Sequence, residues 1–227
     1  MSSNSFADKL SVPINEQSQP PLMLVEHEPF SGIYIDLFRL TLETAGIQYE
    51  FIKVPKIRAR VMFENGEVVL SCCGNPNWRT RAKEQQVQLF SNSFYSTKDV
   101  YIFPSDKSFE IKSVSSLSDK LVALKRGYNY RGEKRFGKKA HLSTQSALLE
   151  FVAKGRADVG IINEDIARHW LTSNKNQIIL GPAHDVADLH IRVHKKRADL
   201  LPRINHAIKQ LIKSGQRDKI VNSYLSK

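Results

Sequence analysis

The fold is decided by the stretch Val68-Val69-Leu70-Ser71-Cys72-Cys73-Gly74-Asn75-Pro76-Asn77-Trp78-Arg79. Its first half is apolar and predicts a β-strand ending near Cys73, and its second half predicts a loop from which Arg79 projects. In open α/β sheets, small ligands bind at the carboxyl ends of the strands. A guanidinium at that place can hold a carboxylate through two parallel hydrogen bonds, so Arg79 is the first candidate binding residue.

Strand and helix patterns alternate on both sides of this stretch. Strand patterns lie at residues 10–14, 49–54, 68–73, 99–104, 121–125 and 159–162, and helical patterns lie at residues 35–45, 57–63 and 200–213 and after Ser143-Thr144. The strand–helix–strand order up to residue 73 predicts a parallel sheet covered by helices. A second α/β series begins after Pro104. The predicted fold class is therefore α/β.

The composition is that of an ordinary folded chain. The 227 residues are 41% hydrophobic and 25% charged, which suits one large domain or two small ones. The 34 Lys and Arg residues outnumber the 23 Asp and Glu residues, giving a net charge of +11. These basic residues are scattered, and the chain has no zinc-finger spacing, RNA-binding sheet signature or basic helical arm. We therefore expect a solvated basic surface and no nucleic-acid partner.

Neither the cysteines nor the apolar segments indicate a cross-linked or membrane-spanning protein. Cys72 and Cys73 are adjacent, and neighbouring side chains on a strand point to opposite faces, so we expect no disulfide between them. The sequence also lacks a metal-binding spacing, and no metal or cofactor is expected. No apolar run reaches transmembrane length, and the polar start lacks the apolar core of a signal peptide. Either the protein is cytosolic or a leader has been removed.

Several short pieces, in their order and spacing, give the chain a family resemblance. The pieces are residues 32–37, the Arg79 loop, residues 90–95, 113–117, 120–127 and 155–158, and the tail from Ile208 to Tyr224. In this set the chain resembles the bacterial extracellular solute-binding protein family 3, the polar amino-acid type of periplasmic receptor. The resemblance extends from about Lys9 to Leu225.

The resemblance implies a two-lobed periplasmic-binding-protein architecture of type II, with the ligand held in a cleft between the lobes. Lobe 1 would be residues 1–103 plus 187–227 and lobe 2 residues 104–186, with crossings near 102–105 and 185–189. It also implies a monomeric, non-enzymatic receptor that closes on its ligand by a hinge. The receptor would work in the periplasm with the membrane permease of an ABC transporter.

The resemblance also assigns candidate ligand-binding residues. Arg79 matches the arginine that pairs with the ligand carboxylate, although Arg81 is a rival two positions on, and Asn75 and Cys73 match positions that line the same pocket. In the second lobe Lys125, Gly127 and Asn129 follow a strand, and the turn there could present N–H groups to an anion at a helix start. Ser143 precedes a helix; the simpler interpretation of Ser143-Thr144 is helix capping.

Asn163 is the departure from the family pattern. Amino-acid receptors commonly have an aspartate there that binds the ligand ammonium, whereas this chain has a neutral amide followed by Glu164. A buried ammonium that faces no carboxylate is costly. The sequence therefore leaves two possibilities: Glu164 or Glu16 takes that role, or the ligand is a small carboxylate without an amine.

Two other functions compete with a transport receptor. A ligand-sensing or effector domain could use the same cleft, but the chain shows no attached output domain. A cleft enzyme such as a dehydratase is the other alternative, but no Ser/His/Asp order, nucleophile elbow or metal pair appears. We expect a solute-binding protein for a small polar carboxylate or an amino acid.

Overall fold

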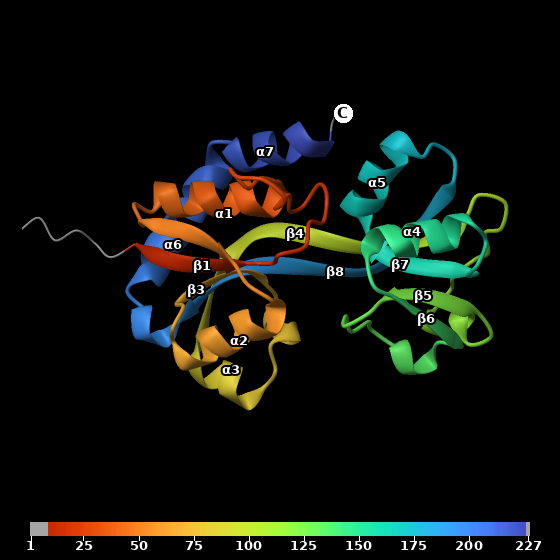
Figure 1. Cartoon of the computed structure of the whole chain (residues 1–227), viewed down its shortest axis with the longest axis horizontal. Helices are drawn as coiled ribbons and strands as arrows, with labels where there is room; N and C mark the ends of the chain where they lie inside the picture. The colour runs from red at the N-terminus through yellow and green to blue at the C-terminus, as the bar shows by residue number, and fades with distance from the viewer. Residues whose placement is uncertain (1–8, 226–227) are drawn as a thin grey trace, which may run out of the picture. The chain divides into compact units, whose positions relative to one another are not determined.

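The computed structural model describes residues 9–225, which form two compact units (Figure 1). Unit 1 contains the described residues up to Ser96 and those from Asp188 onward, and unit 2 contains Thr97–Ala187. The resemblance placed the divisions after residues 103 and 186. The first division falls inside one long strand, so no break in the strand pattern marks it in the sequence.

Unit 1 combines strands with a helical layer (Figure 1). Its elements are β1 (Leu10–Ile14), α1 (Ile33–Thr44), β2 (Tyr49–Lys53), α2 (Lys56–Asn65), β3 (Leu70–Gly74), the 3-10 helix η1 (Pro76–Trp78), α3 (Ala82–Val87), the first part of β4 (Gln88–Pro104), the last part of β8 (Ile178–His194), η4 (Lys195–Arg197), α6 (Leu200–Lys213) and α7 (Gln216–Leu225). Helices α1, α6 and α7 pack against one another.

Helix α1 shows why these residues form a helix in this place. Leu37, Phe38, Thr41 and Leu42 recur at helical spacing and are buried. The helix begins after Gly32, which has a φ of +111°. A Cβ atom added at this position would lie 2.6 Å from the Leu22 carbonyl oxygen, so no larger residue fits here. The Tyr224 hydroxyl of α7 accepts a hydrogen bond from the Gly32 N–H, so α7 also fixes this end of α1.

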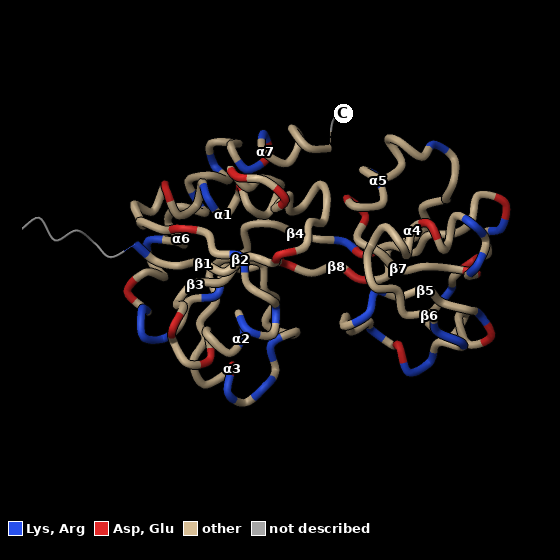
Figure 2. Tube along the Cα trace, viewed as in Figure 1, with Lys and Arg blue, Asp and Glu red and all other residues tan. Residues whose placement is uncertain are grey.

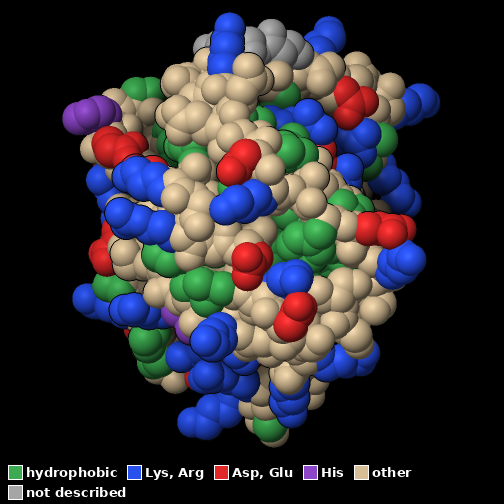
Figure 3. All heavy atoms as spheres, turned by 90° about the vertical axis from the view of Figure 1, so that its right-hand side faces the viewer, with side chains coloured by type: hydrophobic (Ala, Val, Ile, Leu, Met, Phe, Trp, Pro, Cys, Tyr) green, Lys and Arg blue, Asp and Glu red, His purple; other side chains and the backbone are tan. Residues whose placement is uncertain are grey.

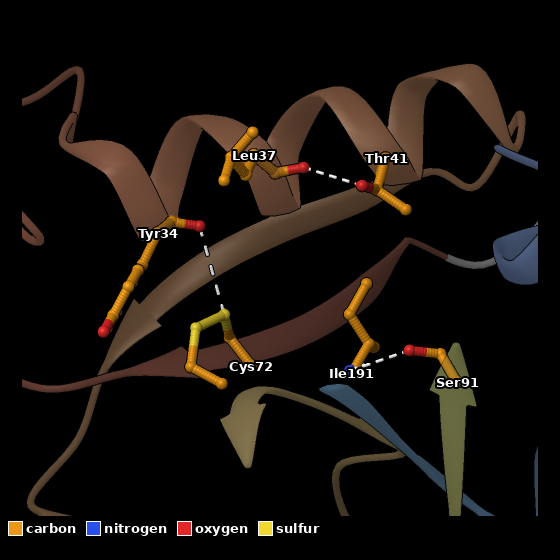
Figure 4. The surroundings of a disulfide bond; sticks show 7 residues. Tyr34, Leu37, Thr41, Cys72, Ser91 and Ile191 are labelled. Carbon is orange, nitrogen blue, oxygen red and sulfur yellow. Dashed lines mark hydrogen bonds between the residues drawn. A yellow bond between two sulfur atoms is a disulfide. The ribbon is translucent and has the colours of Figure 1, made fainter. Parts of the chain in front are cut away.

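The strands of unit 1 are only partly parallel. β1 and β2 pair in parallel, as the strand–helix order predicts, and β3 lies beside β1. β3, however, pairs with β8 in antiparallel orientation, which corrects the expectation of a purely parallel sheet. β8 arrives from more than a hundred residues downstream, so the local pattern gave no sign of it. Ser91 of β4 accepts a hydrogen bond from the Ile191 N–H of β8 at 2.9 Å (Figure 4).

Unit 2 is a second α/β arrangement. Its elements are the end of β4, η2 (Val114–Leu117), β5 (Leu121–Lys125), η3 (Glu133–Arg135), β6 (Lys138–Leu142), α4 (Gln145–Ala153), β7 (Val159–Asn163), α5 (Glu164–Ser173) and the start of β8. β6, β5 and β7 are parallel neighbours, and β4 pairs with β7 in antiparallel orientation. Buried Val122, Leu124, Val159 and Ile161 of these strands form the centre of the core.

Charged residues spread over the surface of both units. Figure 2 shows Lys and Arg positions along the whole described trace, and on the face drawn in Figure 3 they are interspersed with Asp and Glu side chains. No helix among the described residues is both long and apolar enough to cross a bilayer. The net charge of +11 is thus distributed and does not gather in one basic arm.

Candidate functional site

The loop that follows β3 is built by Asn75. This buried side chain accepts a hydrogen bond from the Asn77 N–H at 2.9 Å and donates one to the Asp188 carbonyl oxygen at 2.8 Å. It therefore caps η1 and ties the loop to β8. Both ends of the Asn75 amide are occupied in this way, so Asn75 supports the loop that presents Arg79, whether or not it also touches a ligand.

Arg79 ends η1 with its guanidinium incompletely paired. Its side chain is 24% exposed, and Nη1 lies 4.0 Å from the Glu84 carboxylate. Its Nε is buried and has no hydrogen-bond partner among the described residues. Burial lowers the pKa of Arg79, and Arg60 acts in the same direction while Glu84 opposes it. An arginine remains charged under these conditions, so Arg79 offers a cation with at least one free N–H donor.

A buried ion pair behind Arg79 explains why Glu84 does not neutralise it. Arg192 and Glu84 have side-chain exposures of only 3% and 2%, and their charged groups lie 3.2 Å apart. Arg192 also donates to Gln88 at 3.1 Å and stacks on the Phe63 ring at 4.2 Å. Both guanidinium groups approach the same Glu84 oxygen, so one carboxylate serves two cations. The local excess of positive charge favours an anion beside Arg79.

Arg81 has a different environment. It is exposed and directly precedes α3, and its side chain does not cap that helix. The structure therefore offers two arginines on one loop, a half-buried one and an exposed one. Exclusion of water strengthens a guanidinium–carboxylate contact, and of the two arginines Arg79 is the one that is partly shielded from water.

Cys72 and Cys73 form a disulfide, and the expectation that they would not is wrong (Figure 4). The expectation assumed regular strand alternation through both residues. Cys73 instead has a φ of +68°, and the pairing of β3 with β8 shifts between Ser71 and Gly74. The side chains of the two residues are thereby turned to the same side. Cys73, predicted to line the pocket, is half-buried at the end of β3 that leads to Arg79.

Glu16 is the remaining candidate in unit 1. It lies just beyond the carboxyl end of β1 and is exposed. β1 lies beside β3, whose carboxyl end carries the Arg79 loop. Unit 1 therefore places Cys73 at the end of β3, Asn75 and Arg79 on the loop after it, and Glu16 on another loop.

The candidates of unit 2 gather at one edge of its sheet. β6, β5 and β7 are parallel, so their carboxyl ends share an edge. Lys125 ends β5 and is followed by Gly127 and Asn129, Ser143 follows β6, and Asn163 ends β7 and is followed by Glu164. This is the edge at which α/β sheets bind ligands.

The loop after β5 presents a lysine and exposed backbone. The Lys125 ammonium donates to the Arg126 carbonyl oxygen at 3.3 Å and lies 5.7 Å from the centre of the Tyr128 ring. Burial lowers the pKa of Lys125, with Arg126 as the second cause. Gly127 has a φ of +79°, and Asn129 is exposed. No α-helix starts here: the chain continues through the short helix η3 into β6, so the predicted helix-start anion site is wrong.

Ser143 and its neighbour Thr144 divide the two roles considered for them. The Thr144 side chain caps α4 by accepting a hydrogen bond from the Ala147 N–H at 3.0 Å, which confirms the capping interpretation. Ser143 is exposed and lies one residue before that cap. Its role as a ligand contact stays a prediction.

Asn163 and Glu164 are both engaged within unit 2. Asn163 is buried and caps α5 by accepting hydrogen bonds from the N–H groups of Asp165 and Ile166, and it donates to Thr97 at 2.6 Å. The Glu164 carboxylate pairs with Lys98 at 2.7 Å and with Arg168 at 2.5 Å. Burial alone would raise the pKa of Glu164, but the hydrogen bonds from these two cations lower it.

Asp99 is a notable residue that sequence reasoning missed. It lies on β4 in register with Asn163, and burial raises its pKa to about 6, with the nearby Asp185 as second cause. Nothing in the local sequence distinguishes this aspartate from a surface one. Only the pairing of β4 with β7 brings it beside the predicted residues.

Comparisons with known proteins identify the family of the chain and structures that share its fold. A sequence profile described as "Bacterial extracellular solute-binding proteins, family 3" matches residues 11–227. No curated protein sequence matches the chain.

Solved structures share the fold. The ligand-binding core of GluR0 in complex with L-glutamate has a TM-score of 0.81 at 16% identity, over 97% of this chain and 99% of that one. A histidine kinase sensor domain similar to periplasmic binding proteins has a TM-score of 0.77 at 18% identity, over 96% of both chains. The substrate-binding protein of an amino acid ABC transporter has a TM-score of 0.73 at 20% identity, over 96% and 99% of the two chains. With the profile match covering nearly its whole length, the chain belongs to family 3 of the bacterial extracellular solute-binding proteins.

Proposed function

We propose that this protein binds a small carboxylate solute and that Arg79 anchors the carboxylate. The observation that carries the proposal is the half-buried guanidinium of Arg79, whose Nε has no hydrogen-bond partner among the described residues. A carboxylate can accept two parallel hydrogen bonds from such a group. The competing Glu84 is already held by Arg192 and does not fill the place of a ligand.

The arrangement at the edge of unit 2 supports a solute without an ammonium group. Asn163 is neutral and its amide is used in capping and in bonding Thr97. Glu164 is neutralised by two cations. Lys125, in contrast, is a cation whose pKa is lowered by burial. We therefore propose Lys125, with the exposed backbone of Gly127 and Asn129, as a second group of contacts for an anionic or strongly polar part of the solute.

The physiological setting proposed is solute uptake in the periplasm with an ABC permease. The family is one of extracellular solute-binding proteins. The Cys72–Cys73 disulfide supports an oxidising compartment, because disulfides persist there and are rare in the cytosol. Binding alone, without catalysis, and a monomeric state complete the proposal.

A ligand-sensing domain is the second candidate, favoured by the likeness to a histidine kinase sensor domain. The two functions differ in what the loaded protein does. A transport receptor stimulates ATP hydrolysis by its permease complex in proteoliposomes, whereas a sensor domain does not.

The direct test is thermal unfolding against amino acids, dicarboxylates, keto acids and other small carboxylates. A ligand at a hundredfold excess over its Kd adds about 2.7 kcal/mol of stability. For a chain of this size the rise in Tm is roughly 5–10 °C. If no compound in the panel raises the Tm of a well-folded sample, the carboxylate proposal fails.

Variants then locate the anchor. We expect Arg79→Ala to weaken binding of any hit by at least about 30-fold, because truncating one partner of a desolvated charge pair costs 2 kcal/mol or more. The exposed Arg135 of η3 provides the control, since Arg135→Ala should leave affinity unchanged. Unchanged affinity in Arg79→Ala together with a loss in Arg81→Ala would move the anchor to Arg81.

A further inference from the structure

The disulfide between Cys72 and Cys73 cannot act as a staple of the fold. A disulfide stabilises a protein mainly by closing a loop in the unfolded chain, and its effect grows with the length of that loop. Here the cross-linked residues are adjacent, so the bond closes a ring with no other residue in it. Its effect must be local, at the carboxyl end of β3.

The local effect is on the backbone that leads to the Arg79 loop. Cys73 has a φ of +68°, a left-handed conformation that non-glycine residues rarely adopt. The covalent ring restricts Cys73 and Cys72 together, and the chain then continues into buried Gly74 and Asn75. The ring therefore lies at the end of the strand that leads into the loop of Arg79, six residues after Cys73.

The ring lies beside the backbone of Tyr34, whose side chain packs on Tyr95. Figure 4 shows the two sulfur atoms below the first turn of α1, where the Cys72 Sγ lies 4.0 Å from the Tyr34 carbonyl oxygen. The Tyr34 side chain descends from this turn, and its ring lies 5.7 Å from the Tyr95 ring in an edge-to-face arrangement. Tyr34, Cys72, Cys73 and Tyr95 are all partly accessible to solvent.

These four residues present a surface of one chemical kind. A disulfide has no strong hydrogen-bond donor, and its sulfur atoms are soft and polarisable, as are the faces of aromatic rings. Such a surface gains free energy when an apolar group covers it. A strongly polar group gains nothing there, because it would exchange hydrogen bonds with water for contacts with sulfur and carbon.

We propose that the Cys72–Cys73 disulfide, together with Tyr34 and Tyr95, is the surface on which the apolar part of the solute lies. The preferred solute is then a carboxylate that carries an aromatic or bulky aliphatic group. This inference rests on the proposed function, since it takes the carboxylate anchor at Arg79 as given. It adds a determinant of specificity that the carboxylate anchor does not supply.

The test uses pairs of probes with the same acid group and different side groups. Phenylpyruvate is compared with pyruvate, and phenylalanine with alanine, by titration calorimetry on the full chain. We expect the phenyl member of at least one pair to bind about tenfold or more tightly than its partner, which corresponds to 1.4 kcal/mol. Binding of both members with equal affinity would overturn the inference and leave the proposed function standing. If none of the four probes binds while another small carboxylate raises the Tm, the inference fails and the proposed function stands.

Reduction and substitution then assign the preference to this surface. A dithiol reductant transfers two electrons and two protons to the S–S bond, which becomes two thiols while the reductant becomes a disulfide. We expect reduction, the Cys72→Ser/Cys73→Ser double variant and Tyr95→Ala each to shrink the phenyl preference by about threefold or more. A phenyl preference that persists undiminished in all three samples would overturn the inference.

Matched controls keep the result interpretable. Tyr49 is, like Tyr95, a half-buried tyrosine on a strand of unit 1 with an aromatic neighbour, in its case Phe51. Tyr49→Ala should keep the phenyl preference. The Tm of each sample without ligand and the count of free thiols by alkylation and mass spectrometry show whether the fold is intact and whether the disulfide was present. A loss of preference in Tyr49→Ala equal to that in Tyr95→Ala would contradict the assignment.

Discussion

Replacing Asp99 by asparagine should stabilise the protein at neutral pH and have no such effect in acid. Asp99 lies on β4 in register with Asn163 of β7, and burial raises its pKa from 3.8 to about 6. The Asp185 carboxylate raises the pKa of Asp99 further, and Asp185 is itself paired with Arg131 at 3.6 Å. Tyr130 stays neutral beside them because burial raises its pKa.

The sign of the effect follows from proton binding. The pKa of Asp99 is higher in the folded chain than in the unfolded one, so the folded chain holds more protons between these two values. The stabilisation is fully present below about pH 4 and is lost as the pH rises through about 6. The difference between a pKa of 3.8 and one of about 6 corresponds to a change of at most about 3 kcal/mol in the free energy of unfolding. Asp99 is partly exposed, so we expect about 2 kcal/mol.

The measurement is urea unfolding of the parent protein and Asp99→Asn at pH 4.0 and pH 7.5. Fluorescence of Trp170 in α5 reports on unit 2, in a Trp78→Phe background that removes the tryptophan of unit 1. The gain in the free energy of unfolding should appear at pH 7.5 and vanish at pH 4.0. Asp119, an exposed carboxylate whose pKa is lowered by a hydrogen bond from Lys120, is the control, and Asp119→Asn should give no gain at pH 7.5. An equal gain at both pH values, or a loss at pH 7.5, would refute the reasoning.

Three further predictions concern polar contacts made by buried or half-buried side chains. Glu84→Gln should lower the free energy of unfolding by about 3–5 kcal/mol, because it leaves the buried Arg192 without its charge partner. In chemical denaturation, the control Glu110→Gln in the exposed Glu110–Lys112 pair should change the free energy of unfolding little. Asn163→Ala should cost about 1–3 kcal/mol, since it removes the cap of α5 and the hydrogen bond to Thr97, whereas a cost below that of an exposed Asn129→Ala change would contradict the capping role. Tyr224→Phe should cost about 1 kcal/mol and speed hydrogen exchange at the Gly32 amide; unchanged exchange there would show that α7 does not hold the start of α1.

The order of elements was predictable because it rests on local periodicity. The helical pattern predicted from Ile35 to Ala45 corresponds to α1 at Ile33–Thr44, and the strand predicted to end at Cys73 corresponds to β3 at Leu70–Gly74. What local patterns could not show was the partner of β3. β8 pairs with it in antiparallel orientation from residues 190–193, and only the return of the chain to unit 1 makes that possible.

The candidate site was predictable as a set of positions but not as a set of environments. Lys125, Ser143 and Asn163 were predicted from separate pieces of sequence, and the parallel pairing of their strands brings them to one edge. The failure at Cys72 and Cys73 has a definite physical reason. Strand alternation is a rule for extended backbone, and a single residue at a φ of +68° cancels it. The sequence does not indicate this conformation, because Cys73 is not a glycine.

The distribution of paired and unpaired charges supports a carboxylate as the solute. Glu84 and Glu164 are each approached by two cations within their own unit. Within the described part of the chain, the buried Nε of Arg79 has no hydrogen-bond partner, and the Lys125 ammonium donates to the Arg126 carbonyl oxygen. In each unit taken by itself, this distribution supports the proposed preference for carboxylates over ammonium groups, because a carboxylate can accept hydrogen bonds from the cations. Asn163, which first appeared as a missing aspartate, uses its amide oxygen to cap α5 and its amide nitrogen to bond Thr97, so its side chain is already engaged within unit 2.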